Sequence, residues 1–328
     1  MENLTLDEVL QLYRDMVRIR TFESTVIYES FPKGVLFGNF HPYIGEEAIA
    51  VGACRTIGKA DYIVSTHRGH GHCIAKGADT KKMMAELYGK ETGYCKGRGG
   101  SLHVADVSLG ILGSNGIVGA GIPIAAGAAL AAHIRKSSQV TLGFFGEGAS
   151  NEGAFHEAVN MAAIWKLPVV FVCENNQWAC GTCYTDVLNT PGVAERAAGY
   201  GIVGIRIDGN DVFAVKEAVG EAVQRAREGN GPSIVECLTF RITPHNSSDS
   251  DPRPDELLQE WKQKDPINRL AAFLLRNGAA QKTLDDIQKA ARDEMDSACA
   301  YAEMSAYPNA ADVCEYVYTQ NNEQGVNR

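Results

Sequence analysis

This sequence has few basic residues for its number of acidic ones, and it has no long uncharged apolar run. The chain of 328 residues carries 31 Lys and Arg against 40 Asp and Glu, a formal net charge of -9 at pH 7. Nucleic-acid binders concentrate basic residues on one surface, so we expect no nucleic-acid partner. The most apolar uncharged stretch, residues 116–132, is short for a bilayer span and contains Pro123. We therefore expect no membrane association.

The sequence also lacks the cysteine pattern of a secreted protein. Its nine cysteines are odd in number and scattered, and no signal peptide is recognisable. We therefore expect reduced thiols and a cytoplasmic location. Disorder is not expected, because 45% of the residues are hydrophobic and 22% are charged.

Glycine, by contrast, is abundant. The chain has 34 glycines, and fourteen of them lie between Gly89 and Gly148. Because glycine has no Cβ atom, this density is typical of backbone that passes close to another group. We therefore expect the backbone of residues 89–148 to pass close to another group.

Hydrophobic periodicity predicts helices at both ends of the chain and alternating strands and helices between them. A capping-box pattern from Thr5 to Glu8 precedes apolar residues at helical spacing, which predicts a helix to about Tyr28. The later alternation of strand and helix indicates an α/β fold, a parallel sheet flanked by helices. Residues 1–328 are predicted to form a single domain with an N-terminal helix and a C-terminal helical extension. Strands are expected at residues 140–145, 168–173, 204–207 and 233–240, a long loop at 89–116, and further helices near 46–53, 81–88, 116–132, 151–165, 212–227, 265–276 and 283–302.

Two of the expected strands end in residues that suit a metal ion and a phosphate. The first ends in Gly146-Glu147-Gly148 and the next in Glu174-Asn175-Asn176. In a parallel sheet, ligands bind beyond the carboxyl ends of the strands, where helix N-termini offer free backbone N–H groups. The glycines let the backbone pass close to a phosphate, while Glu147 and Asn176 offer two oxygens to a cation. Few protein oxygens combined with diphosphate oxygens suit Mg²⁺.

The segment GEGASNEGAFHEAVNMAAIWKLPVVFVCENNQW resembles the thiamine diphosphate fingerprint, in which an Asn pair follows GDG after about thirty residues. More closely, the chain resembles alpha subunits of two-chain thiamine diphosphate-dependent 2-oxoacid and acetoin dehydrogenases. The resemblance covers nearly the whole chain through GNFHPYIGEEA, STHRGHGHCIAKG, KGRGGSLHVAD, SNGIVGAGIP, RIDGNDVFAV and TFRITPHNSSDSD. THRGHGH and GYCKGRGGSLH are closer to the acetoin branch than to the pyruvate branch. The resemblance implies a thiamine diphosphate-binding fold with thiamine diphosphate and Mg²⁺ as cofactors.

The resemblance also implies roles for individual residues. Glu147, Asn176 and the backbone carbonyl of Trp178 match the metal ligands, and Gly148 and Ala149 lie on the diphosphate side.

His67 and Arg68 stand where the family has a Tyr-Arg pair, and the Arg68 guanidinium suits bidentate binding of diphosphate. Gly116 and Val118 match residues that present backbone groups to the aminopyrimidine ring. The expected catalytic residues are His70 and His245, which match histidines of the reaction cavity, and His41, which matches a residue near the substrate.

The implied reaction is cleavage of acetoin or decarboxylation of a 2-oxoacid, with transfer of the acyl group to a lipoyl arm on a separate acyltransferase. The cofactor supplies a thiazolium carbanion, and histidines move protons on the intermediates. In the family, the glutamate that activates the aminopyrimidine belongs to the beta chain. The expected partner is therefore a beta subunit, in a heterotetramer of two alpha and two beta chains.

Besides His67, and Arg253 where a Tyr-Arg pair is common, the sequence departs from the family pattern at the metal site and in the late loop. Glu147 replaces the usual Asp, which moves the carboxylate by about one bond length, and Mg²⁺ tolerates altered geometry poorly. Pro244-His245 replaces the usual Gly-His. These departures leave two alternatives open: a thiamine-dependent carboligase subunit that passes the acyl anion to another carbonyl, and a non-catalytic alpha-like chain that supports a partner.

Other motifs allow competing interpretations. His67, His70 and His72 could form a zinc site, although their spacing lacks a fourth ligand. Cys180-Gly-Thr-Cys183 could be a redox pair, but it does not open a helix. GIVGAG at 116–121 could be a dinucleotide loop, but its glycine spacing differs and no strand obviously precedes it. Structural rather than chemical roles are expected for His72, His103, His133 and His156.

Overall fold

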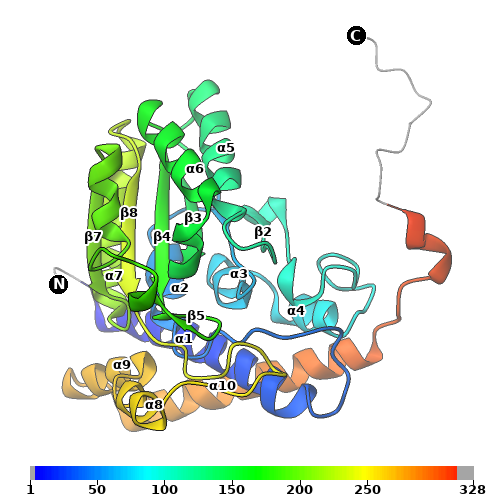
Figure 1. Ribbon diagram of the computed structural model, residues 1–328. Helices are drawn as coiled ribbons and strands as arrows, with labels where there is room; N and C mark the ends of the chain where they lie inside the picture. Colours follow the sequence, from blue (N-terminus) through cyan, green and yellow to red (C-terminus); the bar gives the residue numbers. More distant parts are fainter. Residues whose placement is uncertain (1–3, 316–328) are drawn as a thin grey trace.

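A computed structural model describes residues 4–315, and its centre is a parallel sheet of six strands. The strand order across the sheet is β2-β1-β3-β4-β8-β7, and every neighbouring pair is parallel (Figure 1). The fold class expected from the sequence is therefore confirmed. The strands are β1 (Tyr62–Val64), β2 (Ile111–Gly113), β3 (Thr141–Gly146), β4 (Val169–Asn175), β7 (Val203–Asp208) and β8 (Ser233–Leu238).

Both faces of this sheet are buried under helices. Along β4, Val170 and Val172 belong to one hydrophobic cluster, whereas Val169 and Phe171 belong to another. Side chains alternate between the two faces of a strand, so an uninterrupted apolar strand supplies a core on each side. The cluster of Val169 and Phe171 includes residues of α5 (Gly121–Ile134) and α6 (Gly153–Ile164). The cluster of Val170 and Val172 includes residues of α2 (Glu47–Cys54) and α7 (Val212–Arg227).

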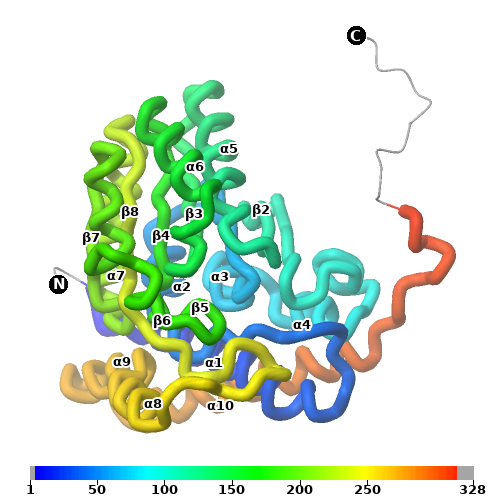
Figure 2. The backbone as a smooth tube through the Cα atoms, viewed as in Figure 1, coloured from blue at the N-terminus to red at the C-terminus, as the bar shows by residue number. Residues whose placement is uncertain are grey.

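The first and last helices of the described chain lie side by side beneath the sheet (Figures 1 and 2). They are α1 (Leu6–Thr25), extended by a π turn at Val26–Ser30, and α10 (Gln281–Met304), next to α8 (Asp255–Lys262) and α9 (Pro266–Arg276). The capping box at the start of α1 is formed: Glu8 N–H donates to the Thr5 hydroxyl, and Thr5 N–H donates to the Glu8 carboxylate at 2.8 Å. Apolar residues of α1, α9 and α10 belong to the larger hydrophobic cluster.

The structure also contains elements that periodicity did not predict. Strands β1 and β2 have three residues each, which is too short for an alternating pattern to be recognised. Two short helices, α3 (His70–Lys76) and α8, were also missed, whereas α4 (Thr80–Leu87) lies where a helix was expected. The segment 89–116 is not all loop, because it holds β2 and the 3-10 turns Gly100–Leu102 and Val107–Leu109.

Helix α5 begins at Gly121 rather than at Gly116, because the segment before it turns toward the carboxyl ends of the strands. The short strand β2 does precede GIVGAG, contrary to the sequence-based interpretation. Among residues 4–315, no helix has both the length and the apolar character needed to cross a membrane.

Candidate functional site

A cavity of about 260 Å³ lies where the connections of the sheet change direction. From β1 the chain moves outward to β2 and then returns to place β3 on the opposite side of β1. Such a reversal opens a crevice at the carboxyl ends of the two strands, where open α/β sheets bind ligands. The cavity is lined by residues that follow β1, β3, β4 and β8, and by the segment before α5.

Most residues expected around a cofactor line this cavity. They are His67, Arg68, Val118, Glu147, Gly148, Ala149, Asn176, Trp178 and His245. Three expected residues do not line it. They are Gly116, His41 and His70. Gly116 faces the ring of His103, which a Cβ atom would approach to 3.4 Å, and His41 contacts the rings of two histidines that line the cavity. His70 is buried outside the cavity.

The acidic end of the cavity is built on the ends of β3 and β4. The Glu147 carboxylate accepts a hydrogen bond from the backbone N–H of Asn176 at 3.2 Å. The Asn176 side-chain oxygen accepts from Trp178 N–H at 3.3 Å. Burial raises the pKa of Glu147 to about 7, while its own backbone and the Arg241 guanidinium act in the opposite direction. A bound cation would favour its ionised form.

Two further carboxyl groups, Glu46 and Glu174, line the same end, and sequence reasoning assigned neither of them a role. Glu46 accepts a hydrogen bond from the Asn176 side-chain amide at 3.1 Å. Burial and then the nearby Glu174 raise the pKa of Glu46 to about 8. Glu174 accepts from the Tyr43 hydroxyl and bonds His72 Nε2 at 2.9 Å.

The basic end of the cavity carries two buried guanidinium groups, Arg68 and Arg241. Arg68 donates to the carbonyl oxygens of Pro42 at 2.6 Å and His245 at 3.2 Å. Arg241 donates to the carbonyl oxygens of Thr243 and Trp178, but its Nη2 is buried without a partner among the described residues. Burial, and then the charge of Arg68, lowers the pKa of Arg241 to about 9. An unpaired buried donor beside a second guanidinium suits an anionic ligand.

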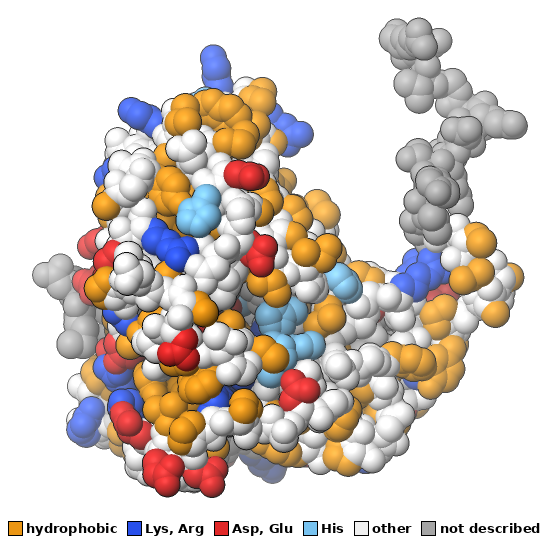
Figure 3. Space-filling view, viewed as in Figure 1, with side chains coloured by type: hydrophobic (Ala, Val, Ile, Leu, Met, Phe, Trp, Pro, Cys, Tyr) orange, Lys and Arg blue, Asp and Glu red, His pale blue; other side chains and the backbone are white. Residues whose placement is uncertain are grey.

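Three imidazoles meet at the side of the cavity. The ring centroids of His41 lie 5.0 Å from those of His67 and His245, and the latter two are 5.7 Å apart. Figure 3 shows histidine side chains gathered near the middle of the displayed face. Burial, followed by the Arg68 charge, lowers the pKa of His41 to about 3, of His67 to about 2 and of His245 to about 4. All three are therefore neutral near pH 7.

His70 and His72 have a different environment, although they lie in the same sequence motif. His70 is fully buried, with Nδ1 3.2 Å from Glu23 and Nε2 3.0 Å from the Ser101 hydroxyl. His72 is also fully buried and bonds Ser65 at 2.8 Å in addition to Glu174. Neither lines the cavity, and the catalytic role expected for His70 stays a prediction.

The arrangement does not support a zinc site. Within residues 4–315, no group of three or more His, Cys, Asp or Glu side chains is placed to hold a metal ion. Glu147, the Asn176 amide oxygen and the Trp178 carbonyl instead offer three oxygens of mixed type, which suits Mg²⁺ completed by ligand phosphates. The unpaired Nη2 of Arg241 lies on the same cavity and fits the anionic part of such a ligand.

A small hairpin and an exposed apolar loop form part of the cavity wall. Strands β5 (Trp178–Ala179) and β6 (Thr182–Cys183) pair antiparallel, and Cys180 in the turn lines the cavity. A Cβ atom on Gly148 would lie 2.7 Å from that of Ala179, so this position requires glycine. All nine cysteines are free thiols. On the loop before α5, Ile117 is 71% exposed and Val118 is 51% exposed.

Sequence reasoning missed Glu46, Glu174 and Arg241 as cavity residues. Two of them carried a signal. Glu174 directly follows the apolar run of β4, and Arg241 comes three residues after the end of β8, so both were candidates for the carboxyl edge of the sheet. The signal for Glu46 was weaker: it lies in the motif GNFHPYIGEEA, but the segment that carries it follows no strand.

Known proteins resemble this chain over nearly its whole length. A model of the dehydrogenase E1 component family matches residues 14–311. The alpha subunit of acetoin:2,6-dichlorophenolindophenol oxidoreductase from Bacillus subtilis is 44% identical over 99% of this chain and 97% of its own length. The corresponding subunit from Cupriavidus necator is 43% identical over 96% and 95%. The pyruvate dehydrogenase E1 component subunit alpha of Porphyra purpurea is 39% identical over 97% and 95%.

Proposed function

Because this chain belongs to the dehydrogenase E1 component family, we propose that it is the alpha subunit of a thiamine diphosphate-dependent dehydrogenase that cleaves acetoin. The observation that carries the proposal is the pairing of two buried guanidinium groups with an oxygen-lined acidic end in one cavity. Diphosphate and Mg²⁺ are the anion and cation that such a cavity suits.

In this proposal, Glu147, Asn176 and the Trp178 carbonyl hold Mg²⁺, and Arg68 and Arg241 hold the diphosphate. Gly148 and Ala149 let the backbone approach the phosphates. When bound, thiamine diphosphate supplies a carbanion that adds to a carbonyl and accepts the electrons of the breaking C–C bond. His245 and His67, which line the cavity, offer the substrate hydrogen bonds as neutral imidazoles, and His41 contacts both rings. His70 has no place in this set, because it is buried outside the cavity.

The charge of the cavity favours acetoin over a 2-oxoacid as the substrate. Arg68 and Arg241 are the cationic side chains that line the cavity, and the diphosphate would engage both. The three imidazoles have pKa values lowered well below 7, so they offer no positive charge to a substrate carboxylate. Acetoin carries no carboxylate and needs only hydrogen bonds. Two relatives named for acetoin are also slightly more similar to this chain than the relative named for pyruvate dehydrogenase.

We further propose that a beta subunit completes the site, in a heterotetramer of two alpha and two beta chains. Ile117 and Val118 support this, because both expose apolar surface beside the cavity. Exposed apolar groups at the rim of a ligand site are typical of surfaces that another chain covers. The acyl acceptor would be a lipoyl group on a separate acyltransferase.

The first test is calorimetric titration with thiamine diphosphate, with and without Mg²⁺, on the chain alone and on the complex with its beta subunit. Mg²⁺-dependent binding is expected, strongest in the complex. The complex should then reduce 2,6-dichlorophenolindophenol in the presence of acetoin, and more slowly with pyruvate. Absence of binding in both states would overturn the proposal and favour a non-catalytic alpha-like chain.

The acyl acceptor needs a separate measurement. The complex is incubated with acetoin and lipoamide, and acyl-lipoamide is quantified against new acyloin products formed with an added aldehyde. Acyl-lipoamide as the main product is expected. Acyloin formation at a higher rate would replace the dehydrogenase with a carboligase.

A further inference from the structure

The amide of Asn176 has two chemically different ends, and only its oxygen can bind a cation. The backbone N–H of Trp178 donates to that oxygen at 3.3 Å, a long hydrogen bond. The amide nitrogen donates to Glu46 Oε1 at 3.1 Å. A cation bound next to this carboxyl group would favour its ionised form, which can only accept, so a flipped Asn176 would then place its own oxygen against another oxygen.

Glu46 is well suited to hold this orientation because it has little freedom of its own. Its side chain is 1% exposed, and it lies on the turn just before α2. The turn is closed by a backbone hydrogen bond from Glu46 N–H to the Tyr43 carbonyl at 3.2 Å.

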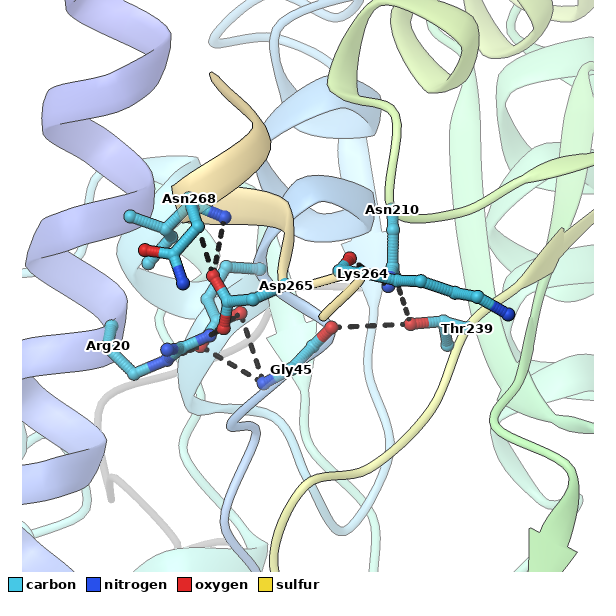
Figure 4. A network of polar contacts seen from close by, with 9 residues as sticks. Arg20, Gly45, Asn210, Thr239, Lys264, Asp265 and Asn268 are labelled. Carbon is cyan, nitrogen blue, oxygen red and sulfur yellow. Dashed lines mark hydrogen bonds and ion pairs between the residues drawn. The ribbon is translucent and has the colours of Figure 1, made fainter. Parts of the chain in front are cut away.

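A network of polar contacts fixes the residues on either side of Glu46 (Figure 4). Gly45 N–H donates to the buried Glu47 carboxylate, which also receives the Arg20 guanidinium of α1. Arg20 in turn pairs with Asp265 at 2.9 Å. The network therefore ties the turn to the first helix of the chain and to the start of α9.

The same turn is also tied to the carboxyl edge of the sheet. Thr239, just after β8, donates to the Gly45 carbonyl at 3.3 Å and lies 2.7 Å from the Asn210 side-chain oxygen. Asn210 donates to the Lys264 carbonyl at 2.9 Å (Figure 4). The backbone that carries Glu46 is thus held from two directions, so its side chain offers Asn176 a fixed acceptor.

We propose that Glu46 is a positioning residue, which orients the Asn176 amide so that its oxygen faces the Mg²⁺ of the proposed cofactor site. The inference rests on the proposed function, because it assigns Asn176 as a ligand of that metal. Partners that orient metal ligands typically change metal affinity by about 10- to 100-fold when they are removed.

The chain offers a matched control one residue away. Asn175 donates its side-chain amide to Glu236 at 2.6 Å, and both side chains are fully buried. Neither of them lines the cavity. Glu236→Met therefore removes a similar Glu–Asn hydrogen bond away from the proposed metal site, together with the bond from Ala194 N–H at 2.9 Å, and it measures the general cost of such losses.

The experiment measures the Mg²⁺ concentration that half-saturates thiamine diphosphate binding, by calorimetry on the alpha–beta complex. Glu46→Met should raise it about 10- to 100-fold. Glu46→Gln, which keeps an acceptor oxygen, should stay within about threefold of the wild type, and so should Glu236→Met. In an Asn176→Ala background, Glu46→Met should add no further effect. Thermal unfolding of each cofactor-free complex checks that all variants are folded.

The outcomes separate this inference from the proposed function. If the wild-type complex binds thiamine diphosphate without any need for Mg²⁺, the assignment of the metal site fails. If the wild type requires Mg²⁺ but Glu46→Met has the same half-saturation, the inference about Glu46 is wrong while the proposed function stands. An equal shift in Glu236→Met would show that the effect is general destabilisation and would also overturn the inference.

Discussion

Two groups of histidines in this protein have opposite environments. His70 and His72 are fully buried, and both ring nitrogens of each have a hydrogen-bond partner. His41, His67 and His245 mainly contact one another beside the cavity, and Nδ1 of His41 is buried without a partner among the described residues.

The presence or absence of hydrogen-bond partners therefore separates structural from functional histidines within one motif. Buried polar groups in folded proteins normally have partners, so His70 and His72 satisfy the usual rule and contribute to stability. Groups that remain without partners beside a cavity are available to a ligand. The sequence THRGHGH contains both kinds within six residues, and residue type alone does not distinguish them.

The largest effect is expected from removing a paired histidine. His70→Leu leaves the Ser101 hydroxyl and the Glu23 carboxyl without their partner, so the free energy of unfolding should fall by about 3 kcal/mol. Urea unfolding of the cofactor-free complex measures this change. His133→Leu, on the exposed side of α5, is the matched control and should change the value by less than about 0.5 kcal/mol. An unchanged free energy of unfolding in His70→Leu would contradict the structural role assigned to His70 and His72.

A loss of ligand affinity is expected when the unpaired cavity arginine is replaced. Arg241→Met removes a buried guanidinium whose Nη2 has no protein partner, so thiamine diphosphate should bind about 100-fold more weakly, close to 2.7 kcal/mol. Calorimetry on the alpha–beta complex is the measurement, with Arg14→Met of the exposed side of α1 as control. Wild-type affinity in Arg241→Met would mean that the diphosphate lies elsewhere.

The cavity histidines should also make stability depend on pH. His67 has a pKa lowered to about 2 in the folded protein, against an ordinary value of 6.5, because it is buried near Arg68. As the pH falls below 6.5 the unfolded chain takes up the proton first, so stability is lost on acidification and is fully present above this range. Between pH 7 and pH 5 we expect a loss of about 1 kcal/mol from this group, after allowance for partial solvent screening. His67→Gln should reduce the slope of unfolding free energy against pH, whereas His133→Gln should leave it unchanged.

The smallest effect is expected at Cys180. Its side chain is exposed and lies in the turn between β5 and β6, so Cys180→Ser should change unfolding free energy by less than about 0.5 kcal/mol. Treatment of the wild-type complex with a mild thiol oxidant should leave activity unchanged. Inactivation that Cys180→Ser abolishes would instead support a redox role for the C-x-x-C motif.

Long periodic segments were predicted well from the sequence. Helix α7 has the expected bounds, Val212–Arg227, because its apolar residues recur at helical spacing and Asp211 caps its N-terminus. Strand β4 agrees within two residues at each end, because an uninterrupted apolar run buried on both faces has few alternatives. The shorter strands β1 and β2 were not predicted, because three residues are too few to show an alternating hydrophobic pattern. These strands form only by pairing with other strands of the sheet.

For the site, the sequence pattern located the acidic strand ends, since glycines and a carboxylate after an apolar run mark the carboxyl edge of a sheet. Arg68 was assigned through the family resemblance alone. The sequence pattern did not reveal Glu46, which reaches Asn176 from a position 130 residues earlier in the chain. Nor did it show which histidine of THRGHGH lies at the cavity.

Local residue pattern was therefore sufficient for the fold class, the family resemblance and the chemistry of the strand ends, because these depend on neighbours in the chain. The partners of His70, the unpaired Nη2 of Arg241 and the hydrogen bond from Asn176 to Glu46 depended on tertiary packing. Burial and hydrogen bonding join segments far apart in sequence, and the pattern of a single segment carries no information about them.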